Sequence, residues 1–365
     1  MTEYQHGGDI YTQEVELDYS ANINPLGLPE SVKQAVIDSL ETCSVYPDSR
    51  SGKLVRELSL FHRIPEEWLI CGNGAADLIF QTVLAGQYKK AVLMAPTFAE
   101  YEQALKTVNC EITYYNVPGE NQFIPDVEAL LEVLDRGCDV LFLCNPNNPT
   151  GIPMKQAEME RVLARCAKQN IMAVVDECFC DFLDDPSLHS VLDRVGVYPN
   201  LIIIKAFTKL YAMAGIRLGY GISSNRVLLD SIESVRQPWS VSAMAQAAGI
   251  AALKETGYVD RARAIVREER RYLMEELKKA GFIVYPSAAN YIFFSWPQQS
   301  KDRDLAALCL KQKILIRSCG NYRGLDASFY RICVKMHPEN QRLMEVLRQT
   351  AAGTSFDIKK WTASE

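Results

Sequence analysis

The sequence predicts an α/β protein in which a mostly parallel seven-stranded sheet with helices on both faces is followed by a smaller α+β domain. Over roughly residues 45–230, short apolar runs alternate with longer helical patterns, as is typical of β-α units in a parallel sheet. After about residue 230 this alternation gives way to a long charged helix and strand-like segments. A length of 365 residues allows two such domains.

The large sheet is expected from apolar runs, and its helices from the 3.6-residue pattern between those runs. The expected strands are Trp68–Cys71, Ala91–Ala95, Glu111–Val117, Val140–Cys144, Met172–Asp176, Leu201–Ala206 and Leu218–Ile222. The expected helices are Ala75–Ala85, Ala99–Thr107, Asp126–Leu134 and Lys155–Lys168. Because strands and helices alternate, the crossover helices should cover both faces of the sheet.

The second part of the chain is expected to form a sheet with helices. Gly257 is expected to end one helical stretch, and a charged helix then covers Asp260–Ala280 and stops at Gly281. Strand-like segments follow, which as antiparallel strands would complete an α+β domain. They are Phe282–Tyr285, Tyr291–Ser295, Ile314–Arg317 and Tyr330–Lys335.

Four regions are expected along the chain. Residues 1–40 contain one helix, Pro29–Leu40, and should dock on the small domain or at the cleft. Residues 41–230 form the large domain and residues 231–350 the small domain. Residues 351–365 show no clear pattern and are expected to be a tail.

Charge and hydropathy exclude several classes of function. The chain has 39 Lys and Arg against 45 Asp and Glu, a net charge of −6, which argues against a nucleic-acid binder. No apolar run reaches the roughly 18 residues of a transmembrane helix. The stretch Met1–Ile10 is polar and lacks the core of a signal peptide.

The eleven cysteines and four histidines give no sign of a disulfide framework or a metal site. No C-x-x-C pair occurs, and the histidines lack the spacing of metal ligands. Several cysteines lie in apolar runs, such as Cys144 in LFLCNP and Cys333 in YRICVK, where a free thiol packs as a small hydrophobe. The sequence therefore predicts buried free thiols, no metal and a cytoplasmic protein.

A polar loop and a carboxylate follow two of the expected strands. Asn145–Gly151, NPNNPTG, comes directly after VLFLC, at the sheet edge where α/β proteins bind ligands. A plain connecting loop is the alternative. Asp176 ends the run IMAVV, where a carboxylate needs a positive partner. That partner is either a structural salt bridge or a cationic cofactor.

Lys209 follows the apolar run LIIIKAF. A lysine held in a cleft loses proton affinity through desolvation and becomes a good amine nucleophile. Arg217, eight residues on, offers a fixed positive charge for a phosphate. The alternative is a lysine at the surface, which applies to Lys205 as well.

A glycine-containing turn, Gly72–Ala76, joins a strand to a helix and exposes backbone N–H groups that can bind an anion. It is a weak signal alone, and it lacks the G-x-G-x-x-G spacing of a dinucleotide site. Taken together, the motifs supply an amine nucleophile, an acid for a pyridinium nitrogen, a polar loop and a phosphate cradle. That set is suited to pyridoxal phosphate.

Over nearly its whole length the chain resembles the class I and II aminotransferases, which are pyridoxal-phosphate enzymes of fold type I. Six motifs appear in the order found in that family. They are YPD at 46–48, GNGAAD at 72–77, PTFAEY at 96–101, NPNNPTG at 145–151, DECF at 176–179 and TKLYAMAGIRLGY at 208–220.

The resemblance implies roles for the matching residues. Lys209 would bind the cofactor covalently and Asp176 would pair with its pyridine nitrogen. The family's sites lie at a dimer interface, which implies a homodimer. The other implied cofactor contacts are Asn148 at the 3′-oxygen, Phe98 on the ring face, Gly74, Ala75, Thr208 and Arg217 around the phosphate, and Tyr46 from the other subunit.

Two positions depart from the family pattern. Position 206 is Ala, where many relatives have Ser, so one hydrogen bond to the cofactor's phosphate is missing. Position 179 is Phe, where typical aminotransferases have a Tyr that donates to the 3′-oxygen. Losing that donor alters the electronics of the ring.

Within the family, the chain most resembles the branch that decarboxylates threonine O-3-phosphate in cobalamin biosynthesis, and Phe179 also fits that branch. Other matching segments are His6–Asp9, Asp18–Gly27, Pro238–Val241, Ile314–Cys319, Asn321–Tyr322 and Gly324–Asp326. The implied products are (R)-1-amino-2-propanol phosphate and carbon dioxide. The implied substrate contacts are His6, Gly7, Asn22, Asn148, Arg317 and Arg331.

Three alternatives stay open at this point. Histidinol-phosphate aminotransferase shares the fold, the cofactor and a phosphorylated substrate. A serine-phosphate decarboxylase differs by one methyl group of the substrate, which is worth only a few kcal/mol at most. A cofactor-binding regulator would usually carry a basic DNA-binding domain, and the presence of Lys209 argues for chemistry. Without the resemblance, His6 would be interpreted as an unordered terminal residue.

Overall fold

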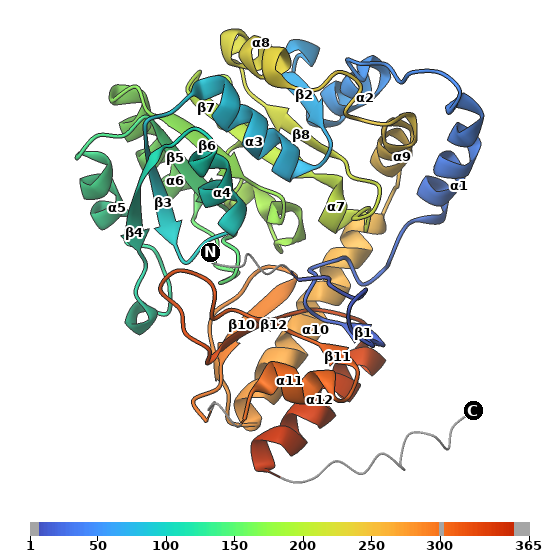
Figure 1. Cartoon of the computed structure of the whole chain (residues 1–365), viewed down its shortest axis with the longest axis vertical. Coiled ribbons are helices and arrows are strands. Elements are labelled where there is room, and N and C mark those ends of the chain that lie inside the picture. The colour runs from blue at the N-terminus through green and yellow to red at the C-terminus, as the bar shows by residue number, and fades with distance from the viewer. Residues whose placement is uncertain (1–6, 299–302, 354–365) are drawn as a thin grey trace.

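The computed structural model describes residues 7–298 and 303–353 and contains a large upper body and a smaller lower one (Figure 1). The upper body holds a seven-stranded sheet with the order β2-β8-β7-β6-β5-β3-β4. Neighbouring strands are parallel except β8, which is antiparallel to β2 and β7. The predicted sheet is confirmed. Its strands are β2 (Leu69–Gly72), β3 (Lys90–Ala95), β4 (Glu111–Asn116), β5 (Val140–Cys144), β6 (Met172–Asp176), β7 (Leu201–Ala206) and β8 (Gly219–Ile222).

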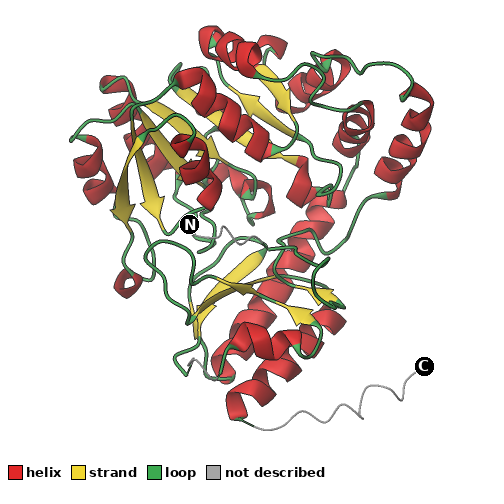
Figure 2. Cartoon of the chain, viewed as in Figure 1, coloured by secondary structure: helices red, strands yellow, loops and turns green. Residues whose placement is uncertain are grey.

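Helices cover both faces of this sheet, as predicted (Figure 2). Successive side chains of a strand point to opposite faces, so Ile202 and Ile204 of β7 lie in one core and Ile203 in the other. The first core is closed by α3 (Ala75–Gly86), α4 (Ala99–Lys106) and α8 (Arg226–Val235). The second is closed by α2 (Gly52–His62), α5 (Val127–Leu134), α6 (Gln156–Lys168) and α9 (Ala243–Leu253).

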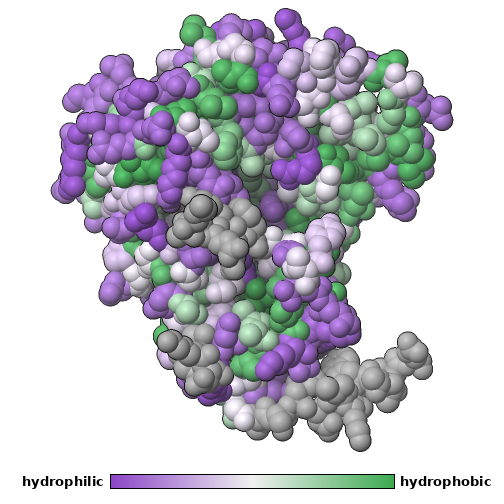
Figure 3. All heavy atoms as spheres, viewed as in Figure 1, coloured by the Kyte–Doolittle hydropathy of each residue, from purple (hydrophilic) through white to green (hydrophobic). Residues whose placement is uncertain are grey.

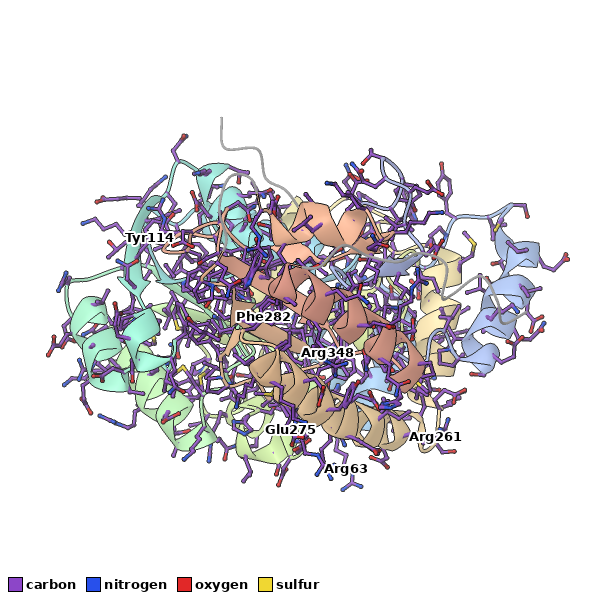
Figure 4. All side chains as sticks on the ribbon, turned by 90° about the horizontal axis from the view of Figure 1, so that it is seen from below. Arg63, Tyr114, Arg261, Glu275, Phe282 and Arg348 are labelled. Carbon is purple, nitrogen blue, oxygen red and sulfur yellow. The ribbon has the colours of Figure 1, made fainter. Side chains whose placement is uncertain are left out.

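The lower body is an antiparallel sheet of order β12-β13-β10-β9, packed against three helices. Its apolar core includes Phe282, which meets Phe294 edge to face with ring centroids 5.4 Å apart (Figure 4). The elements are α10 (Tyr258–Lys279), β9 (Ile283–Val284), β10 (Tyr291–Ser295), α11 (Leu305–Leu310), β12 (Arg317–Ser318), β13 (Phe329–Cys333) and α12 (His337–Ala352).

Two details of the predicted small domain were wrong. The expected strand Ile314–Arg317 is two strands, because β11 (Ile314–Leu315) pairs with β1 (Leu17–Asp18) while β12 pairs with β13. Gly257 does not end the preceding helix, since α9 already ends at Leu253. Gly257 instead precedes α10 with a φ of 71°, a conformation that glycine adopts without strain.

The N-terminal segment contacts both bodies. Its strand β1 pairs with β11 of the lower body, whereas α1 (Glu30–Ser39) packs on α9 beside the large sheet. The expected domain boundary near residue 230 falls inside α8, which packs on α3. We therefore propose that the small domain begins between α9 and α10.

Two other features bear on the predictions from composition. All eleven cysteines are free thiols and most are buried, as predicted. Within residues 7–298 and 303–353, no helix combines the length and the apolar character that crossing a membrane requires.

Candidate active site

A cavity of about 930 Å³ lies between the two bodies at the carboxyl edge of the large sheet. Cys144, Asp176 and Ala206, the last residues of β5, β6 and β7, all line it. The edge position is the one expected for ligand binding in α/β sheets. Most of the predicted site residues share this lining, namely Gly7, Asn22, Ala75, Phe98, Asn148, Asp176, Thr208, Lys209, Arg217, Arg317 and Arg331.

Three predicted residues are not part of this lining. Gly74 directly precedes Ala75 of the lining and lies against Arg217, which is also part of the lining. Tyr46 is 78% exposed and stacks on Trp239, with ring centroids 4.5 Å apart. His6 lies outside the described residues. The proposed role of Tyr46 therefore requires a second subunit.

Two buried lysines, Lys205 and Lys209, lie four residues apart and have pKa values that are shifted in opposite directions. Burial, together with the charges of Arg331 and Arg217, lowers the pKa of Lys209 to about 8. Although burial alone would lower the pKa of Lys205 too, Asp181 and Glu177 raise it well above its usual value.

The Lys205 Nζ lies 3.1 Å from Asp181 Oδ2 and 3.2 Å from Glu177 Oε2. Lys205 is therefore a buried, ion-paired residue and not the surface lysine of the sequence alternative. Lys209, which ends in the cavity, is the better amine nucleophile, since a larger share of it is neutral near pH 8.

Asp176 is held by two hydrogen-bond donors. The Tyr101 hydroxyl donates to Oδ2 at 2.7 Å, and the backbone N–H of Cys178 donates to Oδ1 at 2.9 Å. Within the part of the chain that the structure describes, no cation forms an ion pair with Asp176. Its neighbour Glu177 takes the structural ion pair with Lys205. Asp176 is thus a buried, oriented carboxylate that a cationic ligand would complete.

The phosphate cradle expected at the GNGAAD turn is present. Gly74 has a φ of 91°, and a Cβ there would lie 2.7 Å from Nη2 of Arg217. Only glycine lets the guanidinium lie against this turn. Arg217 therefore sits beside the N-terminal N–H groups of the 12-residue helix α3, which begins at Ala75. A guanidinium at a helix N-terminus is a site for a phosphate.

Arg317 and Arg331 form a second cationic region. They are directly opposite each other in the β12–β13 pair, so their side chains leave the sheet on the same face. Only 7% of Arg317 and 5% of Arg331 is exposed. Among the described residues no carboxylate pairs with Arg331, and its Nε–H is buried without a partner. Arg331 is thus a buried cation that an anionic ligand would complete, and Arg317 places a second positive charge beside it.

Arg331 also orients the polar loop. One of its Nη groups donates to Asn148 Oδ1, and the other donates to the backbone carbonyl of Ser20 at 2.7 Å. Because the oxygen of Asn148 is occupied in this way, the donors of its amide are what remain for a ligand. Asn22 complements it, since its buried Oδ1 is an acceptor without a partner.

The two departures from the family pattern both line the cavity. Ala206 offers no hydrogen-bond donor. Phe179 is buried and meets Tyr291 edge to face, with centroids 5.0 Å apart. The cavity therefore lacks a hydroxyl at both positions.

The residues present fit pyridoxal phosphate. A cationic cradle matches its phosphate, the carboxylate of Asp176 its ring nitrogen, and the amine of Lys209 its aldehyde carbon. The ring of Phe98 supplies an apolar wall. Histidine, cysteine and carboxylate side chains form no metal-binding cluster within the described ranges.

Comparison with known proteins agrees with this chemistry. A family model described as aminotransferase class I and II matches residues 15–347. The threonine-phosphate decarboxylase of Salmonella typhimurium is 35% identical over 357 residues, covering 95% of this chain and 97% of that protein. A putative threonine-phosphate decarboxylase of Caldanaerobacter subterraneus subsp. tengcongensis is 34% identical, covering 95% and 94%.

A solved structure is also similar to this chain in fold and in sequence. The histidinol-phosphate aminotransferase from Clostridium acetobutylicum superposes with a TM-score of 0.86 at 31% identity, covering 92% of this chain and 99% of that one.

Proposed function

The chain belongs to the class I and II aminotransferase family and is a pyridoxal-phosphate-dependent enzyme; from this premise we propose that it decarboxylates L-threonine O-3-phosphate. The products are (R)-1-amino-2-propanol phosphate and carbon dioxide, and the reaction serves cobalamin biosynthesis. The relatives at 35% and 34% identity carry this activity in their names and match along most of the chain.

The observation that carries the proposal is the pair of buried arginines. Arg317 and Arg331 face the same cavity as Lys209 from adjacent strands. A guanidinium forms bidentate, charge-assisted hydrogen bonds with phosphate and carboxylate groups. An amino acid that carries both groups would offer one anionic group to each arginine of the cavity.

The cofactor, when bound, supplies an electron sink for the bond that breaks at the α-carbon of the amino acid. Asp176 would face the ring nitrogen, where its carboxylate would stabilise a proton. Lys209 would hold the cofactor through its amine, and its freed amine would be the group that donates a proton to the α-carbon. Phe98, which lines the cavity, would pack against one face of the ring.

The arginines decide which bond breaks. Only a bond perpendicular to the ring shares its electrons with the ring, so the carboxylate must stand perpendicular for decarboxylation. Binding the distal phosphate at a fixed place sets this pose, which is a use of remote binding energy. Arg317 is itself fixed by donating to Asn321 Oδ1 at 2.8 Å and to the Ser318 carbonyl at 2.7 Å.

The test of the proposed function is a comparison of substrates on the wild-type enzyme. Threonine phosphate, serine phosphate and histidinol phosphate are supplied with and without 2-oxoglutarate, and carbon dioxide and glutamate are both measured. We expect release from threonine phosphate at a rate that does not depend on 2-oxoglutarate. Release that requires serine phosphate, or amino transfer from histidinol phosphate, would support one of the two alternatives.

We further propose that the enzyme is a homodimer with shared sites. Two exposed apolar side chains adjoin Tyr46: its chain neighbour Val45, 66% exposed, and its stacking partner Trp239, 47% exposed. Leu40, six residues earlier in the chain, is 54% exposed. Apolar residues are also visible on this side of the large body, over α1 and α9 (Figure 3). A second copy of the chain would cover them and would bring its cavity to Tyr46.

Mixed dimers test this arrangement. Tyr46→Ala and Lys209→Ala subunits should each be strongly impaired alone. Mixing them should restore activity, because one of the two sites in a mixed dimer keeps both residues. The measurement is turnover after verified subunit exchange. An unchanged low rate would place Tyr46 in the site of its own subunit.

A further inference from the structure

Tyr101 connects two of the residues that are proposed to contact the cofactor ring. It lies on α4, its side chain is fully buried, and its hydroxyl donates to Asp176 Oδ2 at 2.7 Å. The other oxygen of Asp176 accepts from the backbone N–H of Cys178. Each oxygen of the carboxylate therefore has a donor, so the carboxylate has little freedom to turn about its own axis.

The ring of Tyr101 contacts the second residue. Phe98 lies three residues earlier on the same helical path, and the two rings meet edge to face with centroids 5.6 Å apart at 76°. On its other side Tyr101 stacks on Phe142 of β5, with centroids 5.3 Å apart at 26°. One buried ring thus connects α4 to the sheet strand beside Asp176.

The hydroxyl remains a donor across the working range of pH. Burial and the charge of Asp176 raise the pKa of Tyr101 well above its usual value. The thiols of Cys144 and Cys178 also lie beside Asp176, and burial raises their pKa values as well. These neighbours stay neutral. The acidic and basic side chains that line the cavity are Glu100, Glu102, Lys106, Asp176, Lys209, Arg217, Arg317, Arg323 and Arg331.

We propose that Tyr101 is a positioning residue that fixes Asp176 and Phe98 relative to each other and so sets the strength of the carboxylate's contact with the pyridine nitrogen. The inference rests on the cofactor roles proposed above for these two residues. It goes beyond them by assigning a function to a side chain that does not itself need to touch the cofactor.

The test uses the holoenzyme and the conservative variant Tyr101→Phe, which removes the hydroxyl and keeps the ring. One measurement is the affinity for pyridoxal phosphate. The other is the pH at which the absorbance of the bound cofactor changes. Without its donor, Asp176 turns more freely, the ring nitrogen loses its proton more readily, and the linkage to Lys209 becomes more basic.

We therefore expect the absorbance midpoint to move to higher pH, in the same direction as in Asp176→Asn. The dissociation constant should rise about tenfold, as expected for the loss of one hydrogen bond to a charged group. Tyr198→Phe is the matched control, because that hydroxyl also donates to a carboxylate, Glu160, at 2.6 Å, and it is outside the cavity lining. It should move neither quantity.

An unchanged midpoint in Tyr101→Phe, or a shift to lower pH, would overturn the proposal. A second variant, Tyr101→Leu, removes the ring contact with Phe98 as well and should weaken cofactor binding further. Because these readouts need no substrate, they separate this inference from the proposed function. The decarboxylase proposal can fail while Tyr101 still positions Asp176, and the reverse also holds.

Discussion

Lys209→Ala should abolish both turnover and covalent attachment of the cofactor. Borohydride reduction of the wild type should fix the cofactor on Lys209, and peptide mass spectrometry identifies the modified residue. Lys205 is the matched control, since it is four residues away and buried but ion-paired to Glu177 and Asp181. Lys205→Arg keeps the charge and should keep the attachment.

The reaction of Lys209 with the cofactor should also depend on pH. The neutral amine is the reactive form, and burial lowers the pKa of Lys209 to about 8 in the protein without ligand. The rate at which the cofactor-free protein reacts with pyridoxal phosphate should therefore rise between pH 7 and about 9 and then level. A rate that keeps rising toward pH 10.5, or reduced cofactor found on Lys205, would contradict the assignment.

Arg317→Ala and Arg331→Ala should produce the second large effect. Each removes charge-assisted hydrogen bonds worth roughly 1.5–3 kcal/mol, so turnover should fall at least about tenfold. The products should change as well. A loosely held substrate can turn its α-hydrogen perpendicular to the ring, and amino transfer to the cofactor then competes with decarboxylation.

Carbon dioxide and pyridoxamine phosphate are measured together in these variants, and their ratio should fall. Arg270→Ala is the control, because Arg270 is also a buried arginine, held by the carbonyls of Ala288 and Ala289 and outside the cavity lining. It should lower stability without altering the ratio. An unchanged ratio in both cavity variants would mean that the arginines do not orient the carboxylate.

The large sheet could be predicted because its central strands are buried on both faces and appear as continuous apolar runs. The end of helix α9 could not, since a helical stretch was expected up to Gly257 and the helix ends at Leu253. Its residues are mostly small, so it has no distinct apolar face, and it is defined by its neighbours. A Cβ at Gly249 would lie 2.5 Å from Leu218 and 2.9 Å from Leu54, so the close approach depends on tertiary packing.

The division of Ile314–Arg317 into two strands also depends on tertiary contacts. Leu17 and Asp18, almost 300 residues earlier, supply the partner strand for its first half. Nothing in the local pattern indicates this pairing. In the lower body, Arg348 of α12, which is labelled in Figure 4, pairs with Glu276 of α10, another contact that only the fold reveals.

In the candidate site, too, some residues could be predicted from motifs, whereas contacts that depend on the fold could not. Motifs placed Lys209, Asp176 and Arg217 because each follows a recognisable strand or turn. The pairing of Lys205 with Glu177 and Asp181 was not predicted, since those carboxylates come from the end of the neighbouring strand and the turn beyond it. Tyr101 ends the PTFAEY motif, but its contact with Asp176 depends on how α4 packs on the sheet.

We propose that the enzyme removes the carboxylate of threonine phosphate and leaves its amino group in place. The most direct measurement uses threonine O-3-phosphate labelled with carbon-13 in the carboxylate, without any 2-oxo acid, followed by NMR. We expect labelled carbon dioxide and an equal amount of 1-amino-2-propanol phosphate that keeps its nitrogen. An absence of labelled carbon dioxide, with efficient amino transfer from histidinol phosphate to 2-oxoglutarate, would contradict it.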